Sequence, residues 1–105
     1  MNNIKIQHLE LNFTGSGEVE GMAFESFYIS LNAYMYKVTD DGNERFEVFE
    51  RRKTPVCIDF EKRIYSETEF KEIYPKSRDF GVWAWTFSDK EKALNKFMEI
   101  SALNS

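Results

Sequence analysis

Residues of the types that catalyse reactions are few in this chain, and they are scattered. The only cysteine, Cys57, and the only histidine, His8, have the side chains of a nucleophile and a base, but two such residues far apart in a sequence do not define a site. Cys57 lies between Val56 and Ile58, where it is interpreted as a small buried apolar side chain. One histidine cannot form a histidine-rich metal centre. The sequence therefore predicts a protein that is not an enzyme, with no catalytic residue, no metal site and no cofactor.

Carboxylates are plentiful in the first half of the chain, and paired acids can exchange protons with a substrate. No constellation of histidine or lysine residues surrounds them, and they occupy positions typical of turns and solvent-facing strand residues. They are interpreted as a solvated surface, and collectively they could also present a nucleic-acid-like face to a basic partner. These residues are Glu18, Glu20, Glu25, Asp40, Asp41, Glu44, Glu47 and Glu50.

The net charge of −4 is unevenly distributed along the 105 residues. Residues 1–50 contain 3 basic and 9 acidic residues, a balance of −6, whereas residues 51–105 contain 11 and 9, a balance of +2. The change of sign begins at Arg51, Arg52 and Lys53. Such asymmetry either reflects two solvated faces or steers a charged partner into place.

Aromatic and basic residues near the middle of the chain suggest a second kind of chemistry. Tyr34 and Tyr36 alternate on a predicted strand, where they could stack on nucleic-acid bases, while Arg51, Arg52 and Lys53 could hold phosphates. This combination resembles the way in which sheets bind single strands. It predicts an alternative function, a small nucleic-acid-binding or regulatory module with a possible RNA contact.

The densest aromatic stretch lies at residues 80–87, which we expect to form a strand. Alternation places Trp83, Trp85 and Phe87 on one face, and Val82 and Ala84 on the other together with Phe80. The small residues suit close approach of a C-terminal helix, so the tryptophans should project from the opposite face of the sheet. The chain itself, a second copy or a partner must then cover them. Trp83 and Trp85 are therefore predicted to bind a partner.

Several other segments have the patterns of strands, and one pair predicts a hairpin. Residues 33–39 and 44–52 flank the turn sequence Asp40-Asp41-Gly42-Asn43. If Tyr36 faces Val48, apolar residues pair with each other and Lys37 faces Glu47. The pattern therefore predicts this register and a three-residue loop. Alternation also predicts strands near 3–14, 22–31 and 56–61.

Two capping-box patterns predict helices. Ser66-Glu67-Thr68-Glu69 should begin a short helix that ends at Pro75, and Ser88-Asp89-Lys90-Glu91 should begin a helix of about 13 residues. Apolar residues recur at helical spacing along the second segment, with Phe97 at the centre of the stripe. The fold expected from this order is α+β, a mostly antiparallel sheet of four or five strands with both helices packed on one face.

Size and composition predict a single globular domain over residues 1–105. No apolar run approaches the roughly 20 residues that span a bilayer. The chain has no apolar leader at its start, and its one cysteine suits a reducing compartment. The expected location is the cytoplasm, with no membrane partner.

Three stretches, 32–38, 46–51 and 74–85 with the following helix, resemble small uncharacterised proteins encoded by phages and mobile elements of Bacteroidota. The group has no assigned activity and no site residues to transfer. The resemblance implies a non-enzymatic interaction protein, an inhibitor of a host defence complex similar in role to anti-CRISPR proteins. The partner expected from it is a protein or ribonucleoprotein, and a homodimer is also expected as a possibility.

Overall fold

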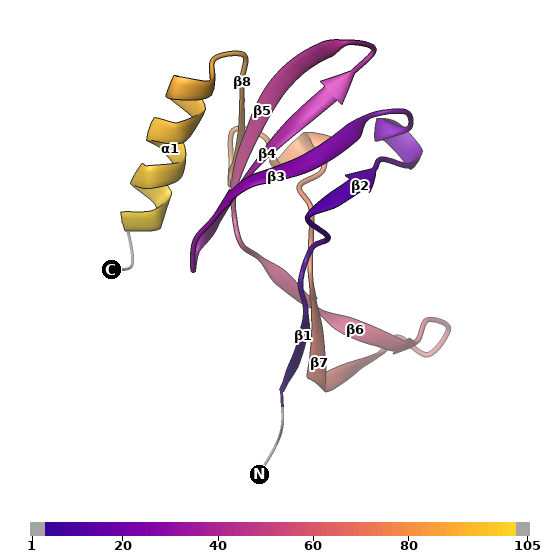
Figure 1. Cartoon of the computed structure of the whole chain (residues 1–105). Coiled ribbons are helices and arrows are strands. Elements are labelled where there is room, and N and C mark those ends of the chain that lie inside the picture. Colours follow the sequence, from indigo (N-terminus) through magenta and orange to yellow (C-terminus); the bar gives the residue numbers. More distant parts are fainter. Residues whose placement is uncertain (1–3, 103–105) are drawn as a thin grey trace. The chain divides into compact units, whose positions relative to one another are not determined.

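The computed structural model describes residues 4–102 and has an α+β fold, as the sequence predicts (Figure 1). The chain divides into two compact units, which are described separately. Unit 1 comprises residues 1–9 and 52–74, and unit 2 comprises residues 10–51 and 75–105. The expected single domain remains a prediction.

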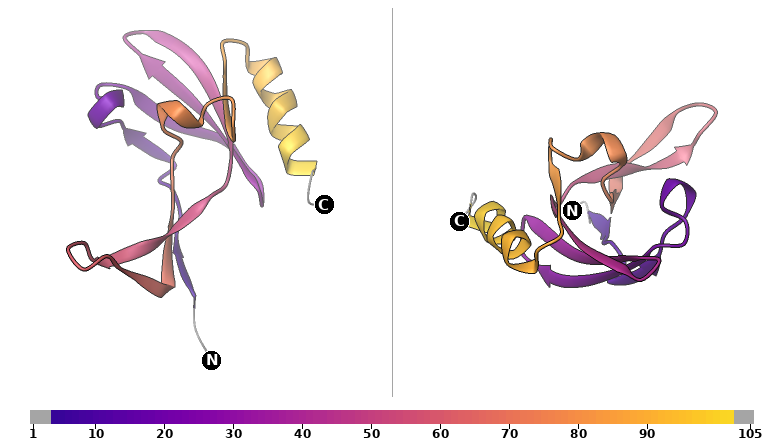
Figure 2. Two further views of the ribbon diagram at one scale, coloured as in Figure 1. Left: turned by 180° about the vertical axis from the view of Figure 1, so that it is seen from behind. Right: turned by 90° about the horizontal axis from the view of Figure 1, so that it is seen from above.

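Unit 2 is built on a five-stranded antiparallel sheet with the order β2-β3-β4-β5-β8. Its strands are β2 (Asn12–Thr14), β3 (Ala23–Ile29), β4 (Ala33–Asp40), β5 (Asn43–Glu50) and β8 (Ala84–Phe87). The helix α1 (Lys90–Ala102) lies along β4, β5 and β8 (Figures 1 and 2). Two short 3-10 helices, η1 (Gly17–Val19) and η2 (Ser77–Asp79), complete the unit.

The face of the sheet under α1, here called the helix face, contains the first apolar core. Met35 and Val48 from the sheet pack with Phe97 and Ile100 from the helix, and all four are buried. The predicted helical stripe is therefore confirmed as the surface through which α1 packs. Trp85 lies at the margin of this core.

The opposite face, here called the aromatic face, contains a second core made of rings. Tyr34, Tyr36 and Phe49 have ring centroids 5.6–5.7 Å apart, and all three side chains are buried. The ring of Trp83 packs edge-on against Phe49, with centroids 6.3 Å apart. Phe13 from β2 meets Tyr36 edge-on at 5.8 Å. Both faces of β4 and β5 are thus covered within unit 2.

The start of α1 is set by an aspartate. The Asp89 carboxylate accepts a hydrogen bond of 2.8 Å from the backbone N–H of Glu91, so Asp89 satisfies one of the free amides in the first turn. The sequence pattern suggested Ser88 as the capping residue, and this assignment is wrong by one position. The helix itself has the predicted length of 13 residues.

The hairpin of β4 and β5 exists as predicted, but its register differs by one residue. Tyr36 pairs with Glu47 and Lys37 with Phe46, and a two-residue turn joins Asp40 to Asn43. Asp41 and Gly42 both have positive φ, 50° and 82°, as a type I′ turn requires. The turn therefore outweighs the cross-strand matching on which the prediction relied. The polarity of facing side chains is a weak guide to the register here because both faces of the sheet are buried.

Replacing Gly42 with alanine is expected to destabilise the chain by about 1 kcal/mol, because only glycine adopts this backbone conformation without strain. A Cβ at this position would meet no atom within 4 Å, so the loss would come from the backbone alone. Urea unfolding measures it. The control Asp41→Asn should be nearly neutral, since asparagine tolerates positive φ. Equal stabilities for wild type and Gly42→Ala would contradict the two-residue turn.

Unit 1 is a three-stranded sheet with the order β1-β7-β6. Its strands are β1 (Lys5–Gln7), β6 (Lys53–Asp59) and β7 (Ile64–Glu72). β6 and β7 form an antiparallel hairpin, and β1 lies parallel to β7 on its other side. The predicted strand near residues 3–14 is therefore interrupted, with β1 in unit 1 and β2 in unit 2.

The short helix predicted after Ser66 is absent, because this segment forms β7. The signal behind the prediction was nevertheless a real interaction. The Ser66 hydroxyl accepts hydrogen bonds from the backbone N–H groups of Thr68 at 3.2 Å and Glu69 at 2.8 Å. The pairing jumps from Cys57–Tyr65 to Pro55–Phe70, so these bonds stabilise a bulge in the strand. The pattern indicated a local turn of the backbone that does not continue as a helix.

Pro55 lies inside β6, which begins before the strand predicted near residues 56–61. β6 forms one edge of the unit 1 sheet, and proline is tolerated on an edge because its missing N–H group can face away from the neighbouring strand. Lys53 precedes it on the same edge. Proline and lysine are residues that protect sheet edges against pairing with other strands.

Candidate functional site

Trp83, the first of the predicted partner-binding residues, is a core residue of unit 2. Its side chain is only 4% exposed, and its ring packs against Phe49. Its carbonyl accepts a hydrogen bond of 3.0 Å from Glu50, and its N–H group donates one of 3.1 Å to Asp79. It precedes β8, which is shorter than the predicted strand. The arrangement leaves almost no ring surface for a partner.

Trp85 lies on the helix face, and the expectation that both tryptophans project away from the helix is wrong. Trp85 pairs with Val48 and is half-buried, with the Lys96 ammonium 4.1 Å from its ring centroid. Ala84 instead pairs with Phe49 on the aromatic face. Val82 is 68% exposed and does not form the small surface expected under the helix. The two tryptophans therefore belong to different cores.

Tyr34 and Tyr36 are also buried, at 2% and 0% exposure. The Tyr36 hydroxyl donates a hydrogen bond of 2.7 Å to the carbonyl of Glu10, and the Arg51 guanidinium lies 4.8 Å from the ring centroid of Tyr34. The rings contact each other and Phe49. They have no open face on which a nucleic-acid base could stack.

The three basic residues at the change of sign have different roles. Arg51 belongs to unit 2 and donates a hydrogen bond of 2.8 Å to the carbonyl of Ser30, so it supports the β3–β4 turn. Arg52 and Lys53 belong to unit 1 and are exposed. The Lys53 ammonium lies 5.5 Å from the ring centroid of Phe70. The use of this run as a phosphate-binding cluster stays a prediction.

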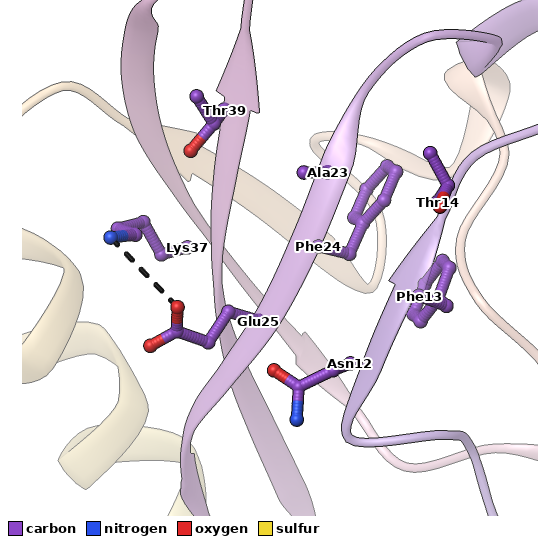
Figure 3. Close-up of a pocket in the computed structure, with 8 residues that line it drawn as sticks. All are labelled: Asn12, Phe13, Thr14, Ala23, Phe24, Glu25, Lys37 and Thr39. Atoms are coloured by element: carbon purple, nitrogen blue, oxygen red, sulfur yellow. Dashed lines mark ion pairs between the residues drawn. The ribbon is translucent and has the colours of Figure 1, made fainter.

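A shallow hollow of about 390 Å³ lies over β2, β3 and β4 of unit 2 (Figure 3). The Lys37 ammonium crosses it towards Glu25 at 4.0 Å, and lies 3.3 Å from Glu44. Phe13 and Phe24 stack beside each other at 4.6 Å. This lining is a paired charge network above a stacked ring pair. Its residues are Asn12, Phe13, Thr14, Ala23, Phe24, Glu25, Lys37 and Thr39.

A second hollow of similar volume contains a buried carboxylate, that of Glu47. The Glu47 side chain is 6% exposed, and its Oε2 accepts a hydrogen bond of 3.0 Å from Arg45 Nε. Arg45 Nη2 lies 3.4 Å from the Met22 sulfur. A buried acid with its own arginine has the arrangement of a structural ion pair. The lining residues are Val19, Met22, Arg45, Glu47, Pro75, Ser77, Phe80 and Thr86.

Neither hollow contains the donor set of a metal centre. Within residues 4–102, no group of three or more histidine, cysteine, aspartate or glutamate side chains is arranged to hold an ion. His8 Nδ1 lies 3.0 Å from Glu72 Oε1, and the same oxygen accepts a bond of 3.3 Å from the Leu9 N–H group. Cys57 is exposed on β6 rather than buried as its apolar neighbours suggested.

Half of the exposed large apolar side chains among the described residues belong to unit 1, although it is the smaller unit. The end of its β6–β7 hairpin is the most exposed part, with Phe60 at 86% and Ile58 at 67%. Ser66 is the only described residue of the unit that is buried. The adjacent residues Ile64 and Tyr65 of β7 point to opposite faces of the sheet, so both faces carry exposed apolar side chains. We use the name unit 1 surface for the whole exposed apolar set, which consists of Ile4, Ile6, Ile58, Phe60, Ile64 and Tyr65.

Sequence reasoning missed this surface, although a signal for it was present. Ile58 and Phe60 alternate with Asp59 and Glu61, which indicates a strand with one apolar side. Within the described part of unit 1, residues 53–65 are followed by no helix that could bury their apolar side, and this pattern indicates an exposed apolar strand.

The helices in the described part of the chain include none with the length and hydropathy needed to cross a bilayer. Comparison with known proteins adds no relative: the chain matches no protein-family model, no curated protein and no solved structure.

Proposed function

We propose that this chain is a non-enzymatic interaction protein that binds its partner through the unit 1 surface. The observation that carries the proposal is that no apolar side chain in the described part of unit 1 is buried. In unit 2, by contrast, buried apolar residues line both faces of the sheet. The chain therefore has one unit with buried apolar cores and one sheet whose apolar side chains are only half-buried or exposed.

The physical argument is the cost of ordering an uncovered sheet. Fixing the backbone of each residue costs about 1–2 kcal/mol, and buried apolar area is the main term that offsets it. A sheet of three strands needs a packed hydrophobic face to be stable. Exposed apolar patches of this kind mark interaction sites in soluble proteins. A partner that covers Phe60 and Ile58 would supply the missing burial.

The nature of the exposed residues favours a protein partner over nucleic acid. The tyrosines that would stack on bases are buried in unit 2, whereas the exposed residues of unit 1 are mainly aliphatic. The hairpin end combines Glu61 with Lys62 and Arg63, so it lacks the basic footprint of a nucleic-acid site.

The more specific proposal is that the partner belongs to a host defence complex, which the chain inhibits. This step rests on the resemblance to small phage and mobile-element proteins, and the unit 1 surface supplies a means of binding. Expression of the chain in a host with an active CRISPR system tests it. If the chain inhibits the defence system, a phage that the system targets should regain its plating efficiency on this host. An unchanged plating efficiency in hosts with several different defence systems contradicts the proposal.

The binding surface itself is tested by affinity capture with matched variants. Phe60→Ser is expected to weaken capture of the partner by about 2 kcal/mol, as loss of an exposed aromatic anchor does. The matched control is Leu31→Ser, because Leu31 is 96% exposed in unit 2. It should leave capture unchanged. Quantitative mass spectrometry of the captured protein provides the measurement.

Nuclease treatment separates the two candidate functions in the same experiment. Capture that survives nuclease and is lost with Phe60→Ser supports the proposed function. Capture that disappears with nuclease, or that is equal for wild type and Phe60→Ser, contradicts it. Nuclease-sensitive capture would instead favour the nucleic-acid-binding alternative.

A further inference from the structure

We infer that β1 is a detachable strand, which the Glu72 side chain clasps to β7, and that its release opens the edge of β7 to an extended peptide. The inference is separate from the proposed function, because it concerns the backbone edge of β7 rather than exposed apolar side chains. Three observations carry it: the few contacts of β1, the hydrogen bonds of Glu72, and the direction of the backbone groups of β7.

Few contacts hold β1 in unit 1. It lies parallel to β7 and is joined to it by three residue pairs (Figure 1). All three residues of β1 are exposed, so no buried apolar side chain of the strand fixes it in place. β6, on the other side of β7, is a longer strand of seven residues. Because segments with few buried contacts open at low free-energy cost, we expect β1 to open while β6 and β7 stay paired.

The Glu72 carboxylate closes the strand at its end. Its Oε1 lies 3.0 Å from His8 Nδ1 and accepts a hydrogen bond of 3.3 Å from the Leu9 N–H group. The Glu72 side chain is only 6% exposed, whereas that of His8 is 59% exposed. One buried carboxylate on β7 therefore fixes the two residues that follow β1. Loss of these hydrogen bonds should favour the open state.

The backbone of β7 shows which of its groups β1 covers. Ile73 donates a hydrogen bond of 2.9 Å to the carbonyl of Arg52, on the side of β6. Successive residues of a strand point their N–H groups to opposite sides, so Lys71 also faces β6, while Phe70 and Glu72 face β1. Release of β1 therefore opens this side of β7 to another strand.

The occupant that suits this edge is an extended peptide, because β1 occupies it in that form. The side chains of β1 are exposed, so the pairing depends on backbone groups more than on sequence, as in other cases of strand addition. A labelled peptide with the sequence of residues 4–9, Ile-Lys-Ile-Gln-His-Leu, is therefore the probe.

Native-state hydrogen exchange of the full chain measures the opening. In the wild type, the amides of Phe70 and Glu72 should be less protected than those of Lys71 and Ile73. His8→Ala should raise the exchange rate at Phe70 by about threefold to tenfold, because it removes one hydrogen bond of the clasp. His8 is exposed, so its replacement should not impair folding. The matched control is Gln7→Ala, at an exposed position of β1 outside the clasp, and it should leave the rate unchanged.

Fluorescence polarisation of the labelled peptide measures occupancy of the edge. The apparent affinity for a site that is open part of the time is proportional to the open fraction, so His8→Ala should bind the peptide more tightly by the factor seen in exchange. This variant keeps Glu72, which can clasp the histidine of the peptide. Glu72→Ala lacks the clasp and should bind the peptide more weakly than His8→Ala. A peptide with Gln7→Pro should not bind, because proline disrupts strand pairing.

Equal protection of Phe70 and Lys71 in the wild type, or an unchanged exchange rate at Phe70 in His8→Ala, overturns the detachable strand. Faster exchange in His8→Ala without any binding of the peptide overturns the edge as a peptide site. These outcomes are distinct from failure of the proposed function, which the capture experiment with Phe60→Ser tests.

Discussion

Replacement of Trp83 with alanine is expected to lower the free energy of unfolding by about 3–5 kcal/mol, as truncation of a large buried aromatic residue does. The indole is 4% exposed and packs against Phe49, which is fully buried. Its removal leaves a cavity between η2 and the aromatic face of the sheet. Urea unfolding followed by circular dichroism gives the difference directly.

The matched control is Trp85→Ala. Trp85 is half-buried at the margin of the helix face, with Lys96 over its ring. Trp85→Ala should therefore lower the free energy of unfolding clearly less than Trp83→Ala does. Partner capture by the folded variants should be retained in both cases. Weak capture with near-normal stability for Trp83→Ala would restore the tryptophans as a binding surface.

Replacement of Phe97 with alanine is expected to destabilise the chain by about 3–5 kcal/mol. Phe97 is 8% exposed and lies between Ala93 and Ile100 on the buried side of α1, with the ring of Tyr28 at 5.8 Å. The variant removes most of the side chain that joins the helix to the sheet. Urea unfolding is again the measurement.

Met98 provides the control for this prediction. It is the next residue in the same helix and is 59% exposed, and methionine and alanine have similar helix propensity. Met98→Ala should therefore change stability by less than about 0.5 kcal/mol. A loss below about 1 kcal/mol for Phe97→Ala would mean that α1 does not pack through its apolar stripe.

The elements that the sequence predicted best are those with a long, consistent period. The apolar stripe through Phe97 extends over the whole of α1, and only one arrangement buries it. The hairpin around Gly42 was also recognisable because its turn residues are specific. The class of fold follows from the order of these elements.

The hairpin register was wrong because pair matching assumes that one face is wet. In the structure the side chains of Tyr36 and Glu47 both lie on the aromatic face, and Arg45 pairs with Glu47 there. Lys37 on the other face reaches Glu44 at 3.3 Å. The observed register therefore pairs both charged residues without the predicted Lys37–Glu47 contact, and its two-residue turn favours it.

The missing helix at residues 66–74 shows how one local motif serves two structures. Ser66 makes the hydrogen bonds that a helix cap would make, but β6 and β1 are available on both sides to pair with the segment. Tertiary pairing overrides a weak local preference. The sequence contains no signal strong enough to show which neighbours the segment will have.

The predicted facing of the two tryptophans was wrong for a related reason. Trp83 and Trp85 were assigned to one face by strict alternation, but β8 begins at Ala84, so Trp83 lies outside the strand. Exposed apolar side chains occur in both units, and those of unit 1 include Ile58 and Phe60. Composition predicts that apolar residues exceed the available cover, whereas only the fold shows which ones remain exposed.

Hydrogen–deuterium exchange, compared between the free chain and the chain saturated with its partner, tests the central claim most directly. Association through the unit 1 surface predicts that amides of residues 53–72, in β6, β7 and the turn between them, gain protection, while those of β8 and α1 exchange as before. Protection gained in β8 or α1, with unit 1 unchanged, would contradict the account and place the interface on unit 2.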